Sequence, residues 1–307
     1  MTTAFISHQD CLRHDMGSYH PESPLRLRAV DDQLIASGLI SYLNHVDAPI
    51  AERAHLERVH SSEYIDSIFA AVPRAGIHHL DPDTAMNPFS LGAALRAAGA
   101  VVHAVDLVLT GKTSTAFCCV RPPGHHAERS RAMGFCFFNN VAVGAAHALE
   151  HYGLKRVCIA DFDVHHGNGT EDIFQNDPRV LMVSTFQHPF YPYSGTESRS
   201  DLMVNIPLPA YTNGQRFRSA VTEYWVPAID VFQPELILIS AGFDAHRDDD
   251  MASMGLVESD YAWVTQQMLT LAEKYCRGRV VSVLEGGYDL HALGRSVTAH
   301  LKVLSGL

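Results

Sequence analysis

The chain has 307 residues, 47% of them hydrophobic and 19% charged, a balance that allows a sizeable buried core. The formal net charge of −11 argues against a general nucleic-acid binder, because such a protein needs a basic face. The first residues show no basic region followed by a long apolar stretch, and no apolar run reaches the roughly 18 residues of a membrane span. We therefore expect a cytoplasmic protein with no membrane contact, and six cysteines without a CxxC pair predict buried thiols in a reducing compartment.

Short apolar runs alternate with longer segments of helical periodicity along the whole chain. The runs lie at residues 4–7, 42–46, 115–120, 156–162, 180–186, 202–206, 235–241 and 279–284. Helices are predicted at residues 90–109, 139–152, 214–232 and 259–276. This alternation predicts an α/β fold, and residues 158–160 and 236–239 are apolar without alternation, which indicates strands covered on both faces. No repeat or linker is visible, so residues 1–307 are expected to form a single domain with a mainly parallel eight-stranded sheet flanked by helices.

Four of these runs end abruptly in residues that can carry chemistry. They lead, in chain order, to His125 and His126, to Asp163 and His165, to Asp244, and to Gly287 and Tyr288. Ligands bind at the carboxyl ends of the strands in open parallel sheets, so we expect the four segments to converge on one crevice.

The segment after residue 160 predicts a metal site. Residues two apart in an extended chain face the same way, so Asp161, Asp163 and His165 are expected to point to one side. Asp163 and His165 form a metal-ligand pair, and Asp244 can supply a third ligand. Two carboxylates and one imidazole suit Zn²⁺, and a catalytic zinc keeps a fourth position open. Fe²⁺ is an alternative, because these ligand types discriminate poorly among such ions.

The neighbouring polar residues suit acid–base chemistry. Beside a metal, the His125–His126 pair can supply a general base and a charged or proton-donating partner. Each ring needs an acceptor on its other nitrogen, for which Asp161 and Asn168 are candidates. Tyr288 follows two glycines that allow close backbone approach, and its hydroxyl could stabilise a developing oxyanion.

Six motifs, taken in order, resemble those of the histone deacetylase family, which has the arginase–deacetylase fold. They are HPESPLRL at 20–27, RPPGHHA at 121–127, GFCFFNN at 134–140, DFDVHHGNGT at 161–170, SAGFDAH at 240–246 and LEGGY at 284–288. The resemblance covers about residues 15–290. Asn168 and Glu285 look like the residues of class II members and their bacterial relatives.

The resemblance implies a zinc-dependent amidohydrolase. Its zinc ligands would be Asp163, His165 and Asp244. His126 would be the general base, supported by Asn168, and His125 its electrostatic partner, supported by Asp161. Tyr288 would polarise the acyl carbonyl together with the zinc.

The resemblance also implies a tunnel for an acyl-lysine side chain. Gly134 and Phe135 would line it, Phe190 or Tyr191 would give the second aromatic wall, and Gly287 would also lie at the substrate. Arg26 would sit near an internal acetate pocket, and Asp81 or Asp83 would hold the substrate backbone at the rim. A structural potassium ion would be held by Asp161, by the Ser184 hydroxyl and by the backbone carbonyls of Asp163 and His165.

The resemblance leaves the substrate open between two classes. Polyamine-selective relatives carry a glutamate at the tunnel mouth, and the corresponding position here looks like Met251. A neutral thioether favours an acyl-lysine protein or peptide, with acetyl as the expected acyl group. Asp248, Asp249 and Asp250 could instead attract a polycation, so an acetylpolyamine or another small acetylated amine is the alternative.

Two other classes of function are less favoured. An inactive acyl-lysine binding module would lack a metal ligand or the tyrosine, and neither is missing. Arginase-like chemistry needs two metals, and the sequence offers one complete ligand set. The sequence makes no prediction of acyl-chain preference, protein partner or oligomeric state.

Overall fold

Eight parallel strands form one sheet at the centre of the protein, in a computed structural model that describes residues 3–197 and 200–307. The order across the sheet is β2-β1-β5-β10-β9-β6-β7-β8. The strands are β1 (Ala4–Ser7), β2 (Asn44–Asp47), β5 (Thr115–Cys118), β6 (Val157–Asp161), β7 (Val180–Gln187), β8 (Met203–Leu208), β9 (Leu236–Ala241) and β10 (Val280–Leu284). β10 is the last strand in the sequence, yet it lies between β5 and β9 in the middle of the sheet. The predicted α/β fold is therefore confirmed, and every pairing in this sheet is parallel.

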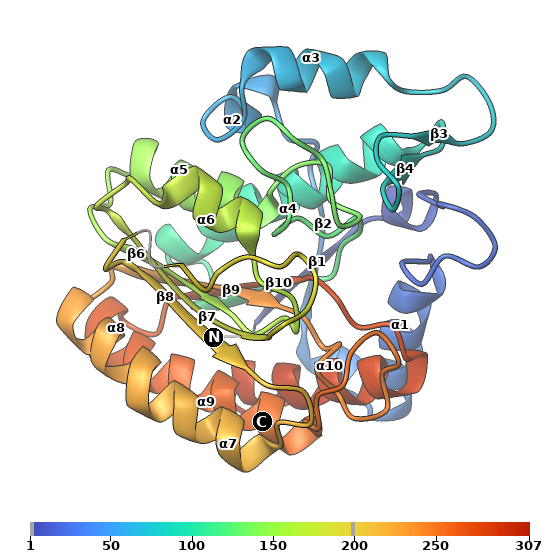
Figure 1. Ribbon diagram of the computed structural model, residues 1–307. Helices are drawn as coiled ribbons and strands as arrows, with labels where there is room; N and C mark the ends of the chain where they lie inside the picture. The colour runs from blue at the N-terminus through green and yellow to red at the C-terminus, as the bar shows by residue number, and fades with distance from the viewer. Residues whose placement is uncertain (1–2, 198–199) are drawn as a thin grey trace.

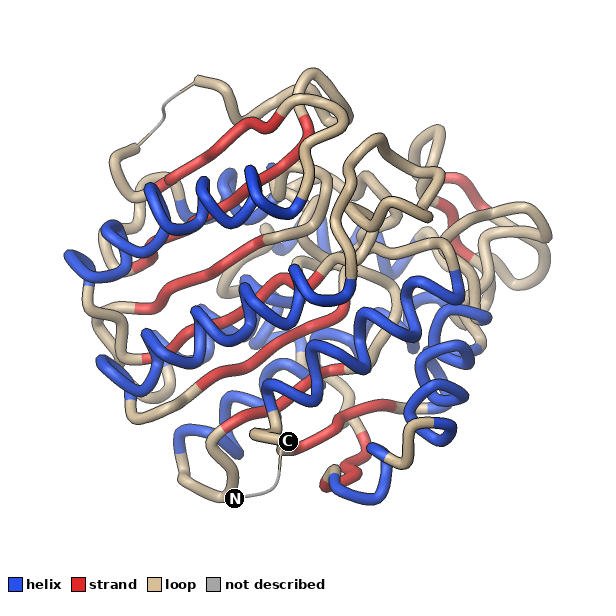
Figure 2. Tube along the Cα trace, turned by 90° about the horizontal axis from the view of Figure 1, so that it is seen from below, coloured by secondary structure: helices blue, strands red, loops and turns tan. Residues whose placement is uncertain are grey.

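Helices cover both faces of the sheet (Figure 1, Figure 2). On one face lie α4 (Ser90–Leu109), α5 (Asn140–Glu150) and α6 (Asn168–Phe174), with α2 (Arg53–Leu56) and α3 (Ser62–Ala70) at the outer edge of this layer. On the other face lie α1 (Leu25–Ala36), α7 (Gly214–Ala220), α8 (Val226–Phe232), α9 (Glu258–Cys276) and α10 (Leu290–Leu304). Smaller elements are the 3-10 turns Gln9–Leu12 and Leu39–Tyr42 and the two-stranded ribbon of β3 (His78–His79) and β4 (Ala85–Met86).

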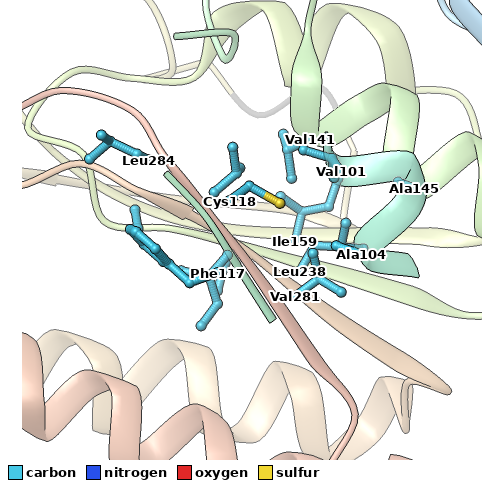
Figure 3. Close-up of a cluster of buried hydrophobic side chains, with 14 of the residues drawn as sticks. Val101, Ala104, Phe117, Cys118, Val141, Ala145, Ile159, Leu238, Val281 and Leu284 are labelled. Atoms are coloured by element: carbon cyan, nitrogen blue, oxygen red, sulfur yellow. The ribbon is translucent and has the colours of Figure 1, made fainter. Parts of the chain in front are cut away.

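The core fills the space between the sheet and each helical layer (Figure 3). Ile159, Leu238 and Val281 are register partners on three adjacent strands, so their side chains share one face of the sheet. Phe117 lies on the opposite face, where its ring contacts His300 of α10. Every residue of β6 and β9 is buried, which confirms the prediction from their unbroken apolar runs.

Helix α4 corrects one sequence expectation. It is 20 residues long with a mean hydropathy of 1.5, so by length and composition it could cross a membrane. However, 67% of its apolar window is buried inside the fold, and it packs against α5 and β5 as a core helix. The first two residues, on which part of the leader prediction rests, lie outside the described residues.

The remaining differences are local. The helix predicted at residues 214–232 is interrupted by a π-helical turn, Val221–Trp225, which separates α7 from α8. β2 begins two residues later than predicted because a 3-10 turn precedes it. All six cysteines are free and buried, as expected for thiols that pack as small apolar groups.

Candidate active site

Asp163, His165 and Asp244 come together at the carboxyl end of the sheet, beyond β6 and β9. His165 Nδ1 lies 3.0 Å from Asp163 Oδ1 and 3.2 Å from Asp244 Oδ2. One ligand atom of each residue lies within 4.8 Å of the other two, and all three side chains are buried. Within residues 3–197 and 200–307, this is the one group of three or more such side chains that could hold a metal ion.

The hydrogen bonding of the two carboxylates fits a cation at their centre. Asp244 Oδ1 accepts from the Val164 backbone N–H at 2.9 Å, while Asp244 Oδ2 is buried and makes no hydrogen bond within the described part of the chain. Asp163 accepts from the backbone N–H groups of His165 and Gly286, each at 2.9 Å. A buried carboxylate oxygen is costly unless it is paired or coordinates a metal, so these residues fit zinc or a similar ion.

Two glycines give the carboxylates the room that they need. A Cβ at Gly286 would lie 2.0 Å from Asp244 Oδ2, and a Cβ at Gly242 would lie 2.0 Å from Asp163 Oδ2. Real Cβ atoms do not approach so closely, so neither position accepts a larger residue without displacing a carboxylate.

The carboxylates of Asp163 and Asp244 repel each other, and a bound cation would relieve this repulsion. Burial and the neighbouring Asp163 carboxylate raise the pKa of Asp244 to about 6. Burial alone would lower the pKa of His165, but the Asp163 and Asp244 carboxylates raise it to about 9. Because an imidazole must be deprotonated to bind a metal, metal binding here would release a proton.

The two adjacent histidines make different hydrogen bonds. His125 Nδ1 lies 3.0 Å from Asp161 Oδ2, and His126 Nδ1 lies 2.7 Å from Asn168 Oδ1. Asp161 therefore faces His125 and does not join the three ligand residues. The extended geometry expected for residues 161–165 ends with β6 at Asp161, and residues 163–165 form a bend.

The pKa values of these histidines are shifted in opposite directions. Burial lowers the pKa of His125, but Asp163 and Asp161 outweigh it and raise the pKa to about 10. Burial, with His125 and His165 nearby, holds the pKa of His126 well below its usual value. These shifts favour the neutral form of His126 and the charged form of His125, so His126 has the protonation state that a proton acceptor needs.

Tyr288 reaches the site from the loop after β10. Burial and the Asp244 carboxylate hold its pKa well above the usual range, so the phenol keeps its proton and can donate a hydrogen bond. Asp249 Oδ2 accepts from the backbone N–H of Tyr288 at 2.6 Å and of Asp289 at 3.0 Å, which fixes this loop.

A cavity of about 280 Å³ leads down to these residues. It is lined by Asp83, His126, Gly134, Phe135, His165, Phe190, Tyr191, Met251 and Tyr288. Phe190 stacks on His165 with ring centroids 5.4 Å apart, and Tyr191 meets His126 edge-on at 5.3 Å. The second aromatic wall, expected from either residue, is thus made by both.

The wall formed by Gly134 and Phe135 is a left-handed turn, with φ of 56° and 68° respectively. A side chain at Gly134 would meet the His126 ring at 2.4 Å. The turn is held by Asp83 Oδ1, which accepts from Gly134 N at 3.2 Å, and by Thr84 Oγ1, which accepts from Phe135 N at 3.0 Å.

Comparisons with known proteins agree with this geometry. Residues 20–304 match the histone deacetylase domain. The chain belongs to the histone deacetylase family. It is 35% identical over 329 residues to a histone deacetylase-like amidohydrolase of Pseudomonas aeruginosa, covering 99% of this chain and 86% of the relative. It is 37% identical to the polyamine deacetylase HDAC10 of Mus musculus, covering all of this chain and 48% of that protein. The crystal structure of the HDA15 HD domain superposes with a TM-score of 0.93 at 34% identity, covering 99% of this chain and 88% of that one.

This family membership supports hydrolase activity, and the remaining predicted residues can be located in this deacetylase fold. Ser184 of β7 pairs with Asp161 of β6, and its hydroxyl is buried without a hydrogen bond to any described residue. Arg26 is buried and donates to the carbonyls of Gly287 at 2.6 Å and Glu285 at 2.5 Å. Arg26 and Gly287 lie outside the lining that the described residues give the 280 Å³ cavity.

The sequence alone does not identify several supporting residues. It places Asp249 only within a run of three acidic residues, Asp248 to Asp250, near the tunnel mouth. Glu285, noted only for its motif, accepts from the backbone N–H groups of Gly124 at 2.7 Å and His125 at 3.2 Å. Burial raises the pKa of Glu285 to about 7. Asp81 Oδ1 accepts from the backbone N–H groups of Asp83 and Thr84, so it shapes a turn below Asp83.

Proposed function

We propose that the protein is a zinc-dependent hydrolase that removes an acyl group, acetyl in the first place, from a lysine side-chain amide. The observation that carries the proposal is the cluster of Asp163, His165 and Asp244 at a cavity whose lining also includes His126 and Tyr288. When bound there, zinc would polarise the acyl carbonyl and lower the pKa of an attacking water.

The chain's own residues supply the rest of the chemistry. His126 Nε2 accepts a proton from the attacking water while the water oxygen forms a bond to the acyl carbon. The Tyr288 hydroxyl donates a hydrogen bond to the carbonyl oxygen as negative charge develops on it. The C–N bond then breaks, and the leaving nitrogen takes up the proton, so one water yields one carboxylic acid and one amine.

The tunnel supports a substrate with an unbranched aliphatic stem. Phe135, Phe190 and Tyr191 present aromatic surfaces around it, which suit the methylene groups of lysine. At the mouth Met251 carries no charge. Asp249 is buried, and its carboxylate accepts hydrogen bonds from three backbone N–H groups. Asp248 Oδ2 lies 3.0 Å from the guanidinium of Arg295. These contacts pair two of the three carboxylates in the 248–250 segment, which leaves the exposed Asp250 as the one in this segment that could attract a polycation.

A second candidate is an acetylpolyamine or another small acetylated amine. It is favoured by the similarity to a relative named polyamine deacetylase and by exposed Asp250 at the mouth. A structural potassium ion at Asp161 and Ser184 is a separate part of the proposal, supported by the unpaired Ser184 hydroxyl.

The deciding experiment measures kcat/KM for acetyl-lysine peptides and N-acetylpolyamines on zinc-loaded, iron-loaded and chelator-treated protein. We expect the peptide to be preferred and the chelated protein to be inactive until metal returns. Tyr288→Phe tests the role of the phenol and should lose on the order of 10²–10³ in kcat. A preference for polyamines would replace the substrate class, and hydrolysis by fully chelated protein or by Tyr288→Phe at the normal rate would overturn the chemistry.

A further inference from the structure

Glu128 lies outside the tunnel, on the far side of Asn168 from His126. It lines a separate pocket of about 130 Å³, together with Met133, Asn168 and Asp172. Its backbone is fixed, because Glu128 N donates to Arg131 O at 2.9 Å and its carbonyl lies 3.0 Å from His60 Nδ1. The tunnel lining given by the described residues does not include Glu128, so a substrate in the tunnel does not touch it.

A chain of hydrogen bonds connects Glu128 to His126. Asn168 Nδ2 donates to Glu128 Oε1 at 2.8 Å and to Met133 Sδ at 3.3 Å. On its other side, Asn168 Oδ1 lies 2.7 Å from His126 Nδ1. Asn168 thus joins the Glu128 carboxylate to the His126 imidazole.

The chemistry of these groups decides which way the amide of Asn168 faces. An ionised carboxylate can only accept, so it requires the NH₂ group of Asn168 on its side. The amide oxygen then faces His126, and Nδ1 of His126 must carry the hydrogen. Nε2 is left without a hydrogen, as a proton acceptor requires.

We propose that Glu128 is a positioning residue that selects the tautomer of His126 through Asn168. The inference rests on the proposed function, in which His126 Nε2 accepts the water proton. Without a carboxylate at position 128, Asn168 can turn its amide over, donate to His126 Nδ1, and leave the hydrogen on Nε2. Such a molecule binds substrate normally but has no free base.

The test uses three variants and one control on the zinc-loaded protein. Glu128→Gln keeps the shape of the side chain but can donate as well as accept, so both amide orientations become available. Asn168→Asp places two carboxylates at the 2.8 Å contact. The double variant, Glu128→Gln with Asn168→Asp, exchanges the two groups, so that the carboxylate introduced at position 168 can again accept from His126. Asp172→Asn removes a charge from the same pocket, where its carboxylate accepts from Arg129 N rather than from Asn168.

We expect Glu128→Gln and Asn168→Asp each to lose on the order of 10-fold in kcat with KM unchanged, by analogy with other groups that orient a histidine. The exchanged variant should regain most of this loss, and Asp172→Asn should match the wild type. Normal kcat in Glu128→Gln, or an exchanged variant whose loss is the product of the single losses, would overturn the inference.

A second measurement separates this inference from the proposed function. Long-range ¹H–¹⁵N spectra of ¹⁵N-histidine-labelled protein report the tautomer of His126 without turnover, assigned by the loss of its signals in His126→Asn. The hydrogen should be on Nδ1 in the wild type and distributed over both nitrogens in Glu128→Gln. If the wild-type enzyme hydrolyses no acyl amide, the proposed function fails, yet these spectra still decide the role of Glu128.

Discussion

An alanine methyl group at position 286 would occupy the space in which the two ligand carboxylates lie. It would come within 2.0 Å of Asp244 Oδ2 and 2.6 Å of Asp163 Oδ2. We expect Gly286→Ala to fold but to bind zinc ~10–100-fold more weakly, because displaced ligands lose the geometry that the ion needs. Metal content after dialysis against a graded series of zinc buffers measures the effect.

The matched control for this variant is Gly92→Ala. Gly92 lies on the exposed side of α4, and a Cβ there meets nothing within 4 Å. Alanine is the better helix former by about 1 kcal/mol, so this variant should keep its zinc and gain slightly in stability. Equal zinc affinity in the two variants would show that the close approach at Gly286 does not govern the site.

The loop between β9 and α9 acts as a clamp on the loop after β10. Its Asp249 carboxylate accepts from the backbone N–H groups of Met251, Tyr288 and Asp289. Asp249→Ala leaves three donors without this acceptor, so it should reduce the free energy of unfolding by about 1–3 kcal/mol and lower kcat because Tyr288 is no longer held.

Urea unfolding and steady-state kinetics measure both effects of Asp249→Ala. Asp250→Ala removes the next carboxylate of the same loop, which is exposed. This variant should leave the free energy of unfolding and kcat for the lysine substrate unchanged. If both variants behave alike, the clamp is not what positions Tyr288.

The apolar runs and the polar residues that follow them are sufficient to predict the sheet and the convergence of Asp163, His165 and Asp244 on one site. Residues such as Asp163 and His165 stand out because ionisable groups next to a buried strand are costly unless they are paired or coordinate a metal. The supporting contacts could not be predicted in this way. Whether Asp248, Asp249 or Asp250 turns inward depends on the path of the loop, and the contact of Glu128 with Asn168 joins residues 40 positions apart through side-chain orientation alone.

At the scale of the whole molecule, a buried histidine links α9, β10 and α10 by hydrogen bonds and makes the free energy of unfolding depend on pH. His300 is fully buried; its Nδ1 lies 2.6 Å from Thr265 Oγ1 and its Nε2 lies 2.9 Å from Ser282 Oγ. Thr265 donates its own hydrogen to the Tyr261 carbonyl, so it accepts from His300, whose Nε2 then accepts from Ser282. Burial lowers the pKa of His300 to about 3, which keeps the ring neutral.

A histidine with a lowered folded-state pKa binds its proton more tightly after unfolding. Its contribution to stability is complete above the unfolded pKa of about 6.5 and is lost as the pH falls toward about 3. From pH 7.5 to pH 5 the wild type should therefore lose about 2 kcal/mol more unfolding free energy than His300→Gln. Urea unfolding at both pH values measures this, with His79→Gln, a change at an exposed histidine, as the control. Identical pH dependence in wild type and His300→Gln would contradict the prediction.

The place of β10 in the strand order has a consequence for protein synthesis. Until Val280–Leu284 has left the ribosome, β2, β1 and β5 are separated from β9, β6, β7 and β8 by an empty position, and each half exposes an unpaired edge. The three candidate metal ligands are all present in the nascent chain at Asp244, some forty residues before this gap can close. A metal at this site would therefore enter a finished pocket only after β10 has left the ribosome, and nascent chains that stall before β10 should be targets for chaperones and proteases.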